Sequence, residues 1–215
     1  MWLVSTPPLR PYHHGHLRSA LVEAGTELAR EGGPDAVVVR AASRRVGVSH
    51  NAAYRHFPDR DALLKAVCGR CMSALARLME AGIAAVDPDD HSVEADQARL
   101  RATGRAYVEF ALAEPGWFRT AFAVPPGLGY LDAGEGGGAS GMGPFELLSA
   151  QLEALAAAGA IPPKRRPYAE ITAWSAVHGF SSLLLDGPLR ALPVPEREDA
   201  LGRLLDNIER GLISP

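Results

Sequence analysis

The feature that most restricts the fold of this chain is Gly47, which has a short helix pattern on each side. Glycine adopts the left-handed backbone of a tight turn without steric cost, so Gly47 is expected to end one helix. Two positions later, Ser49 is a favourable N-cap for the next helix. Ala42 and Ala53 are small enough for the two helices to cross closely. Residues 38–57 are therefore predicted to form a helix-turn-helix.

The rest of the chain also has the apolar spacing of amphipathic helices, interrupted by glycine and proline. The predicted helices cover residues 16–31, 38–46, 49–56, 60–85, 93–113, 144–159, 165–186 and 195–213, with a further short helix after Pro115. Residues 124–144 are rich in glycine and proline and are predicted to form a mobile loop.

No alternating pattern typical of strands occurs, so the predicted fold class is all-α. The long helix that begins at Arg60 is expected to join two parts of the chain. Residues 1–60 are predicted to form a three-helix helix-turn-helix domain. Residues 61–215 are predicted to form a helical domain for ligand binding and dimerisation.

The composition, 47% hydrophobic and 22% charged, is typical of a soluble globular protein. No apolar run approaches the roughly 18 residues that a membrane span requires. The apolar start, residues 1–4, is too short for the core of a signal peptide. With only two cysteines, the chain has no disulfide framework, as expected of a reducing compartment. We expect a cytoplasmic protein that does not contact a membrane.

Positive charge is concentrated at the start of the chain, although the net charge of the whole chain is −3. Residues 1–60 contain eight Arg and no Lys against five acidic residues, a net charge of +3, which leaves −6 for the remainder. Five of the seven histidines also lie in this segment. A basic head on an acidic body is typical of a DNA-binding domain joined to another module.

The start of the third predicted helix is where a recognition helix presents side chains to base edges. This position holds Ser49, His50 and Asn51. Asparagine can bind adenine through two hydrogen bonds, and histidine can donate or accept one. The residues suited to phosphate contacts lie further along and are Tyr54, His56 and Arg60. The amides at the start of the long helix, near Arg60, also favour an anion. The same spacing fits a helical hairpin with no DNA role.

Three segments together resemble the head of the tetracycline repressor (TetR) family. They are residues 12–18 (YHHGHLR), 47–49 (GVS) and 53–64 (AYRHFPDRDALL), and the resemblance covers about residues 12–70. Further on, residues 173–179 (AWSAVHG) resemble the Trp-x-x-x-His-Gly signature of one C-terminal subgroup.

The resemblance implies a homodimeric transcription regulator with a variable ligand domain, and a repressor that a ligand releases from a double-stranded DNA operator. It implies that Arg40, His50 and Asn51 approach the bases, while Tyr54, His56 and Arg60 hold phosphates. Two residues depart from the family pattern. Val39 stands where Ser or Thr often caps the second helix, and Ser43 replaces a small apolar residue. We expect the Ser43 hydroxyl to bond back to its own helix.

The C-terminal half is rich in aromatic residues that could line a largely apolar cavity for a small-molecule effector. The candidate ligand-binding residues are Tyr107, Phe110, Trp117, Phe118, Phe122, Trp174 and His178. The alternative is that they are ordinary core residues. His178 follows Trp174 by one helical turn, so the two share a helix face. It is interpreted either as a pocket residue or as a hydrogen-bonded core histidine.

Apolar residues on the last two predicted helices form stripes that suit a four-helix dimer interface. The residues assigned to that interface are Leu184, Leu185, Leu204, Leu205, Ile208 and Leu212. The alternative is that the stripe covers the core of its own chain.

Two sensing chemistries are alternatives to a small-molecule effector. Cys68 and Cys71 share one face of the long helix, which favours a thiol- or metal-sensing regulator. Against this, no strand precedes them, and a structural zinc needs about four ligands. His13, His14 and His16 could bind a metal but have no carboxylate or thiol nearby in sequence. We expect no metal and no cofactor.

An enzyme is the alternative from another class. Ser175, Ser181 and Ser182 lie near His178, which would suit a small helical hydrolase. No Gly-x-Ser-x-Gly elbow is present, however, and the glycine-rich residues 134–143 lack the Gly-Lys-Ser/Thr of a phosphate loop. We therefore expect no enzyme activity.

Overall fold

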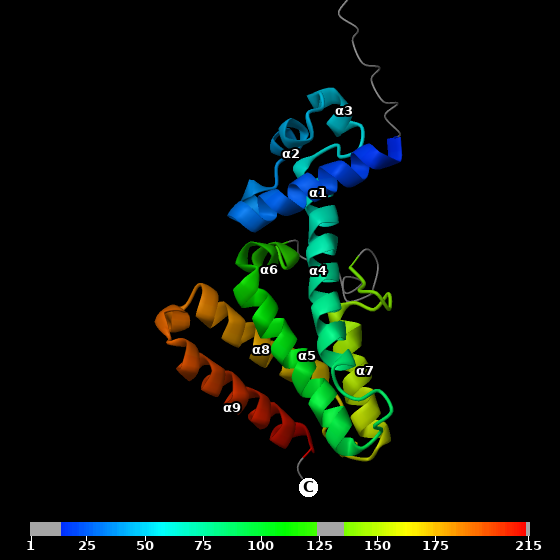
Figure 1. Cartoon of the computed structure of the whole chain (residues 1–215), viewed down its shortest axis with the longest axis vertical. Helices are drawn as coiled ribbons and strands as arrows, with labels where there is room; N and C mark the ends of the chain where they lie inside the picture. The colour runs from blue at the N-terminus through cyan, green and yellow to red at the C-terminus, as the bar shows by residue number, and fades with distance from the viewer. Residues whose placement is uncertain (1–13, 124–135, 214–215) are drawn as a thin grey trace, which may run out of the picture.

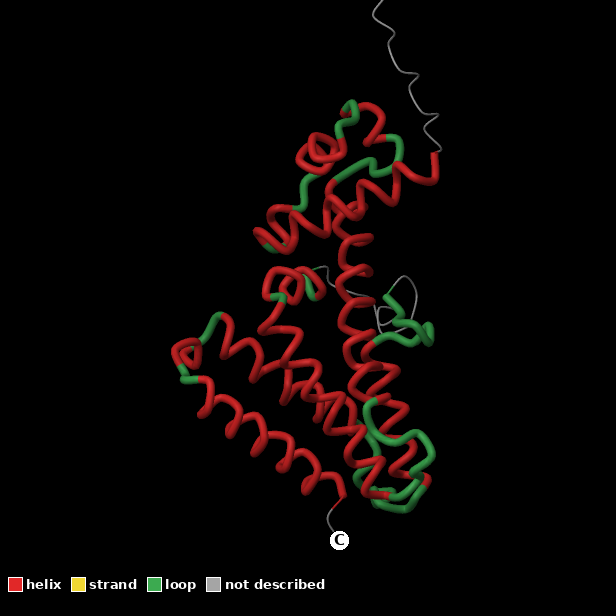
Figure 2. The backbone as a smooth tube through the Cα atoms, viewed as in Figure 1, coloured by secondary structure: helices red, strands yellow, loops and turns green. Residues whose placement is uncertain are grey.

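A computed structural model of the chain describes residues 14–123 and 136–213. Within these ranges the chain forms helices joined by loops, with no strand, and the all-α prediction is confirmed (Figure 2). The helices are α1 (His14–Gly32), η1 (Pro34–Ala36), α2 (Val39–Val46), α3 (His50–Tyr54), α4 (Arg60–Ala84), α5 (Val93–Ala113), α6 (Pro115–Ala121), α7 (Pro144–Ala157), α8 (Ala169–Leu185), η3 (Pro188–Ala191) and α9 (Val194–Ile213).

Helices α1, α2 and α3 form a head at one end of the molecule, and α4 runs from this head into a helical body (Figure 1). In the body, α5 and α7 lie along α4, and α8 and α9 cover α5. The short helix α6 lies between the body and the head, where it packs against both α1 and α4. The first residue of α4 is Arg60, and the division into domains at residues 60 and 61 stays a prediction.

Side-chain caps begin three of the helices. The Asp59 carboxylate accepts from Ala62 N at 2.7 Å at the start of α4, and the Ser49 hydroxyl accepts from Ala52 N at 3.3 Å at the start of α3. Both caps were predicted and are confirmed. Ser92 caps α5 in the same way.

Helices α3 and α8 are shorter in the structure than predicted. Helix α3 ends at Tyr54 rather than near residue 56, because Pro58 and the Asp59 cap start a new element. Helix α8 begins at Ala169 rather than at residue 165, because Pro167 has no amide hydrogen to donate within a helix.

The predicted mobile loop lies partly outside the described residues, which exclude 124–135. Residues 136–143 are described and are held against α4, contrary to the prediction. The Glu80 carboxylate accepts from Ala139 N at 2.7 Å and from Ser140 N at 2.8 Å. The Ser73 hydroxyl donates to Gly137 O at 2.6 Å. These bonds satisfy backbone groups that a loop would otherwise expose to water.

One hydrophobic cluster extends from the head through α4 into the body. It joins Leu21 of α1 and Phe57, just before α4, with Val67 and Leu75 of α4 and Leu205 of α9. All five side chains are almost completely buried. Removing apolar surface from water is the main favourable contribution to folding, so the head and the body stabilise each other. No helix within residues 14–123 and 136–213 is both long and apolar enough to cross a membrane.

The predicted dimer stripe belongs largely to the core of a single chain. Leu184, Leu205 and Leu212 are already buried in the single chain, before any second chain is added. Assigning them to a dimer interface is therefore wrong. The reason is that α9 folds back on α5 and α8, and the Leu205 side chain fills the space beside Gly104. The other predicted interface residues, Leu185, Leu204 and Ile208, are half-buried against the same core.

We predict that Gly47→Ala destabilises the protein, because Gly47 has a φ of 75° and alanine is strained in that region. The expected loss is about 1 to 2 kcal/mol, or roughly 2 to 8 °C in Tm. A Cβ at Gly47 would meet no atom within 4 Å, so any loss measured by thermal unfolding reports backbone strain alone. Gly211→Ala in α9 is the control, since that site is also open but helical. Equal Tm values for the two variants would contradict the assignment.

Candidate functional site

The turn between α2 and α3 has the predicted geometry. Gly47 adopts φ 75° and ψ 30°, and Val48 N donates to Ser43 O at 3.0 Å, which closes the end of α2. Ala42 and Ala53 are completely buried where the helices cross. The helix-turn-helix prediction is therefore confirmed at the level of the backbone.

The structure shows the surroundings of the two residues in α2 that depart from the family pattern, Val39 and Ser43. The N-cap is Val38, which has no side-chain cap, and Val39 is the first helical residue and is buried. The Ser43 hydroxyl donates to Arg40 O at 3.0 Å, as predicted. Helix α2 thus starts without a polar cap and is held in place by the burial of Val39.

Three predicted DNA-binding side chains from α2 and α3 meet on one exposed face of the head. Arg40 Nε donates to His50 Nε2 at 3.2 Å, and the rings of His50 and Tyr54 have centroids 4.2 Å apart. Arg40 and Tyr54 are both exposed. A cation, an imidazole and a phenol hydroxyl are thereby presented together, and each can donate a hydrogen bond.

The other predicted DNA-binding residues are arranged differently. Asn51 is exposed on α3, and the Ser49 hydroxyl is used as the cap of that helix. His56 is half-buried beyond the end of α3. Arg60 is turned toward η1, where its guanidinium donates to Pro34 O at 2.7 Å and lies 3.5 Å from Asp35. The structure therefore does not bring Arg60 to the face formed by the residues of α2 and α3.

Several exposed arginines of the head were not singled out from the sequence, among them two on or beside the helices of the helix-turn-helix. Arg44 lies on α2 and Arg55 directly follows α3, and both side chains are exposed. The excess of arginine in residues 1–60 was the only signal in the sequence that pointed to them. That excess does not specify which arginines face outward.

An aromatic cluster in the body brings together five of the predicted ligand-binding residues. Trp174 Nε1 donates to the Tyr107 hydroxyl at 3.0 Å, and that hydroxyl is hydrogen-bonded to His178 Nδ1 at 2.8 Å. The ring centroids of Phe122 and Phe118 lie 4.9 Å and 5.4 Å from that of His178. Helices α5 and α8 thus form one polar network, and Phe118 of α6 and its C-cap Phe122 pack aromatic rings against it.

Burial sets the charge state of the histidine in this cluster. Desolvation lowers the pKa of His178 below its usual range, because a half-buried site disfavours the imidazolium. The hydrogen bond with Tyr107 supplies the partner that a neutral core histidine requires. Phe145 of α7 also packs against Trp174, with centroids 6.0 Å apart, and was not among the predicted ligand-binding residues.

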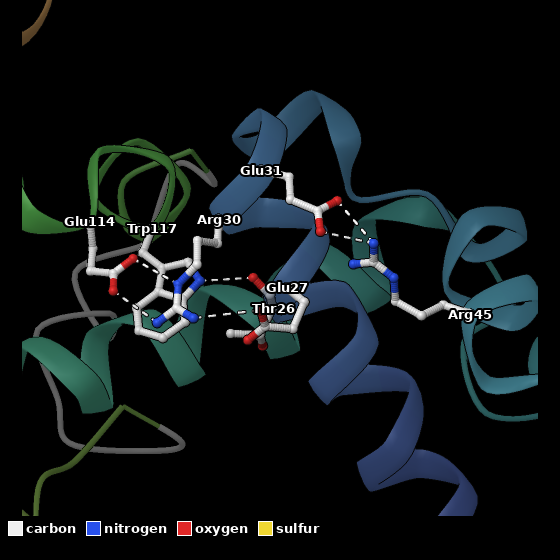
Figure 3. Close-up of polar contacts among 7 residues, drawn as sticks. All are labelled: Thr26, Glu27, Arg30, Glu31, Arg45, Glu114 and Trp117. Atoms are coloured by element: carbon white, nitrogen blue, oxygen red, sulfur yellow. Dashed lines mark hydrogen bonds and ion pairs between the residues drawn. The ribbon is translucent and has the colours of Figure 1, made fainter.

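The remaining two predicted ligand residues make other contacts. Phe110 is buried in the main hydrophobic cluster. Trp117 is on the opposite side of α6 and faces the head, where its indole N–H donates to Thr26 O at 2.8 Å (Figure 3). The Arg30 guanidinium lies over its ring at 4.0 Å from the centroid. Trp117 therefore belongs to the junction with the head and not to the aromatic cluster around His178.

The two cysteines lie in the core. Cys68 and Cys71 are buried, and the Cys68 thiol donates to Thr120 O at 2.9 Å. Burial raises the pKa of the Cys71 thiol far above its ordinary value, and the nearby Cys68 acts in the same direction. Because the thiolate is the reactive form, the site is poorly suited to redox sensing.

The serines of the hydrolase alternative lie within the described residues, and the histidines of the metal alternative lie only partly within them. Ser181 is buried and its hydroxyl donates to Val177 O at 2.8 Å, so it is engaged with its own helix. In residues 14–123 and 136–213, no cluster of three metal-ligating side chains occurs. His13 and the side chain of His14 lie outside the described residues.

The comparisons with known proteins agree with this geometry. Residues 21–67 match the model for bacterial regulatory proteins of the tetR family, and residues 100–208 match the model for the tetracyclin repressor-like C-terminal domain. No curated protein matches the chain. A protein of unknown function from Rhodococcus sp. RHA1 is 27% identical with a TM-score of 0.74, over 96% of this chain and 100% of its own.

Two further solved structures share the fold and contain a small molecule. A TetR variant from Acinetobacter baumannii AYE in complex with minocycline is 18% identical, with a TM-score of 0.60, over 90% of this chain and 94% of its own. RolR in complex with resorcinol is 13% identical, with a TM-score of 0.63, over 94% of this chain and 95% of its own.

A helix-turn-helix head on a helical body defines the class as DNA-binding transcriptional regulators, which are not enzymes. The chain belongs to the tetracycline repressor family. Proteins of this family bind DNA operators and small-molecule ligands, typically as dimers. The resemblance inferred from residues 12–70 is thereby confirmed, and the hydrolase alternative is excluded.

We predict that His178→Gln weakens the loss of stability in mild acid. Because the pKa of His178 is lowered in the folded chain, the unfolded chain binds more protons once the pH falls below about 6.5. The free energy of unfolding of the natural chain should therefore decrease between about pH 7 and pH 5, and that of the variant should decrease less. Urea titrations across this range measure the difference. An unchanged slope in His178→Gln would contradict the assignment.

Proposed function

We propose that the chain is a repressor that a small, largely apolar ligand releases from its operator. The observation that carries the DNA-binding part is the exposed face on which Arg40, His50 and Tyr54 meet. On this proposal Arg40, His50 and Asn51 contact base edges in the major groove. The Tyr54 hydroxyl and the His56 imidazole hold the phosphate backbone.

The proposed effector site is the aromatic cluster around His178. Its rings offer an apolar surface, and the Tyr107 hydroxyl and the His178 imidazole provide the few polar groups that orient a ligand. A neutral His178 avoids placing an unpaired charge against an apolar molecule. The solved structures with minocycline and with resorcinol support an aromatic effector.

We also propose that the functional unit is a homodimer formed through α8 and the start of α9. Four of the large apolar side chains exposed in the described residues lie on these helices or beside them: Tyr168, Ile171, Leu183 and Val194. A second copy that covers them would remove this apolar surface from water. A two-fold axis would also place two heads for two half-sites of an operator.

Release would then be a shift between populations that differ in the spacing of the two heads. A ligand that binds one spacing more tightly moves the equilibrium toward it, in proportion to that difference in affinity. Coupling of this kind is typically about 1 to 3 kcal/mol. Helix α4 is the continuous element between the cluster and the head.

The DNA-binding proposal predicts that Arg40→Ala raises the Kd for a cognate duplex by roughly 5-fold or more, since a base contact is lost. Tyr54→Phe keeps the ring against His50 but loses the hydroxyl, so a rise of roughly 2- to 10-fold is expected. Fluorescence anisotropy with a duplex enriched from a random pool measures both. Arg77→Ala, an exposed arginine on α4, is the matched control and should bind normally. Normal affinity in both Arg40→Ala and Tyr54→Phe would refute the proposed contacts.

The dimer proposal predicts that Ile171→Glu and Leu183→Glu yield folded monomers. Their side chains are 54% and 44% exposed in the single chain, so a charge there leaves the chain's own core intact. Leu78→Glu on α4, at 37% exposure, is the control and should stay dimeric. Light scattering gives the mass, and circular dichroism confirms the fold. A natural chain that is monomeric at micromolar concentration, or two glutamate variants that remain dimers, would overturn the proposal.

A further inference from the structure

The hydrogen bond between Trp174 and Tyr107 has only one possible direction. An indole N–H can donate a hydrogen bond but cannot accept one. Trp174 Nε1 lies 3.0 Å from the Tyr107 hydroxyl, so the hydroxyl oxygen is the acceptor. Tyr107 is almost completely buried on α5, and its ring is therefore held in place by the surrounding core.

The hydrogen bond between Tyr107 and His178 takes its direction from this first bond. The Tyr107 hydroxyl lies 2.8 Å from His178 Nδ1. A phenol hydroxyl holds one hydrogen, and its oxygen here already accepts from Trp174. Donation of that hydrogen to Nδ1 gives a continuous run of hydrogen bonds in one direction, and bonds in such a run strengthen one another. We therefore take His178 Nδ1 as the accepting nitrogen.

The direction of these bonds determines which nitrogen of His178 carries the hydrogen. Burial lowers the pKa of His178, so the neutral imidazole is favoured. A neutral imidazole has one donating and one accepting nitrogen, and Nδ1 is the accepting one. The hydrogen is therefore on Nε2, which points away from Tyr107 because it is on the other side of the ring.

The surroundings of His178 Nε2 are aromatic. Among residues 14–123 and 136–213, no protein group accepts a hydrogen bond from this nitrogen. The rings of Phe122 and Phe118 pack against the imidazole, with centroids 4.9 Å and 5.4 Å from its own. An N–H that faces an aromatic ring makes only a weak hydrogen bond. The Nε2–H group is thus a donor that an acceptor from outside the chain would satisfy.

We propose that Trp174, Tyr107 and His178 form a hydrogen-bond relay that makes His178 Nε2 a donor, and that the effector is an uncharged aromatic molecule with an oxygen acceptor, such as an aryl ketone or ester. The inference rests on the proposed function, because it names the chemical class that binds at the proposed effector site. Trp174 and Tyr107 are positioning residues in this relay, since they act on the effector through His178.

Each part of this class follows from a feature of the site. The rings of Phe118 and Phe122 offer an apolar surface on which another aromatic ring can pack. A carbonyl oxygen accepts a hydrogen bond and has no hydrogen to donate, so it matches a single N–H group. An ammonium group has no acceptor for this N–H, and its charge would be buried beside a neutral imidazole.

The test compares two probes of nearly the same shape, acetophenone and α-methylstyrene. They differ only in that the C=O group of the ketone is replaced by C=CH2 in the alkene. The Kd of each probe is measured by NMR titration of the full-length natural chain, His178→Leu, His178→Gln and Phe145→Leu. The alkene is the more apolar probe, so the readout is the ratio of its Kd to that of the ketone, compared between variants.

In His178→Leu the ratio should fall roughly 2- to 10-fold relative to the natural chain, the usual effect of one neutral hydrogen bond. His178→Gln keeps an N–H donor on a side chain of similar length and should retain much of the preference. Phe145→Leu is the matched control, because Phe145 packs against Trp174 but takes no part in the relay. In that variant the two Kd values should change together and leave the ratio near that of the natural chain.

Nitrogen-15 NMR of the histidine rings, recorded without a probe at a pH above the ordinary pKa of histidine, tests the relay even if His178→Leu does not fold. The natural chain should show His178 with Nε2 protonated and Nδ1 unprotonated. A proton on Nδ1, or a Kd ratio that is the same in the natural chain and in His178→Leu, overturns this inference alone. Failure of both probes to bind the natural chain counts against the proposed effector site and overturns this inference with it.

Discussion

The structure depends on the burial of α4 on both sides along its length. Near its start, Leu63 and Val67 pack with the head, and further along Leu75 and Met79 pack with the body, all within one hydrophobic cluster. Burial of this kind is not directional, but close packing means that a shift at one end of a buried helix has to be accommodated at the other. The head and the body are therefore not independent units joined by a flexible linker. Because they share one core, a change in the packing of the body can affect the head.

Polar contacts add orientation to this shared core. Arg60 reaches back to Pro34 O, Glu31 binds Arg45, and Arg30 binds Glu114, so each pair connects elements that the core alone would leave free to slide. All three pairs are at least partly exposed, and such pairs contribute little free energy. These contacts stabilise one arrangement of α1, α2 and α6 relative to others that would bury a similar apolar area.

Local features were predictable from the sequence, and contacts between distant segments were not. The turn at Gly47 and the caps at Ser49 and Asp59 depend on a few neighbouring residues, so their chemistry can be seen directly in the chain. The aromatic residues were also identified, but not that Trp117 turns toward Thr26, because α1 and α6 are far apart in sequence. The spacing of Leu205 and Leu212 in α9 correctly predicted a buried stripe. Periodicity cannot distinguish burial against the same chain from burial against a second chain.

The claim that the head and the body share one core is tested most directly by urea unfolding of the full chain, followed segment by segment with pulsed hydrogen exchange. If α4 holds both parts in one cooperative unit, peptides from α1 to α3 and peptides from α5 to α8 should lose protection at the same urea concentration. A head that opens at a clearly lower urea concentration, while α5 and α8 remain protected, would contradict the account.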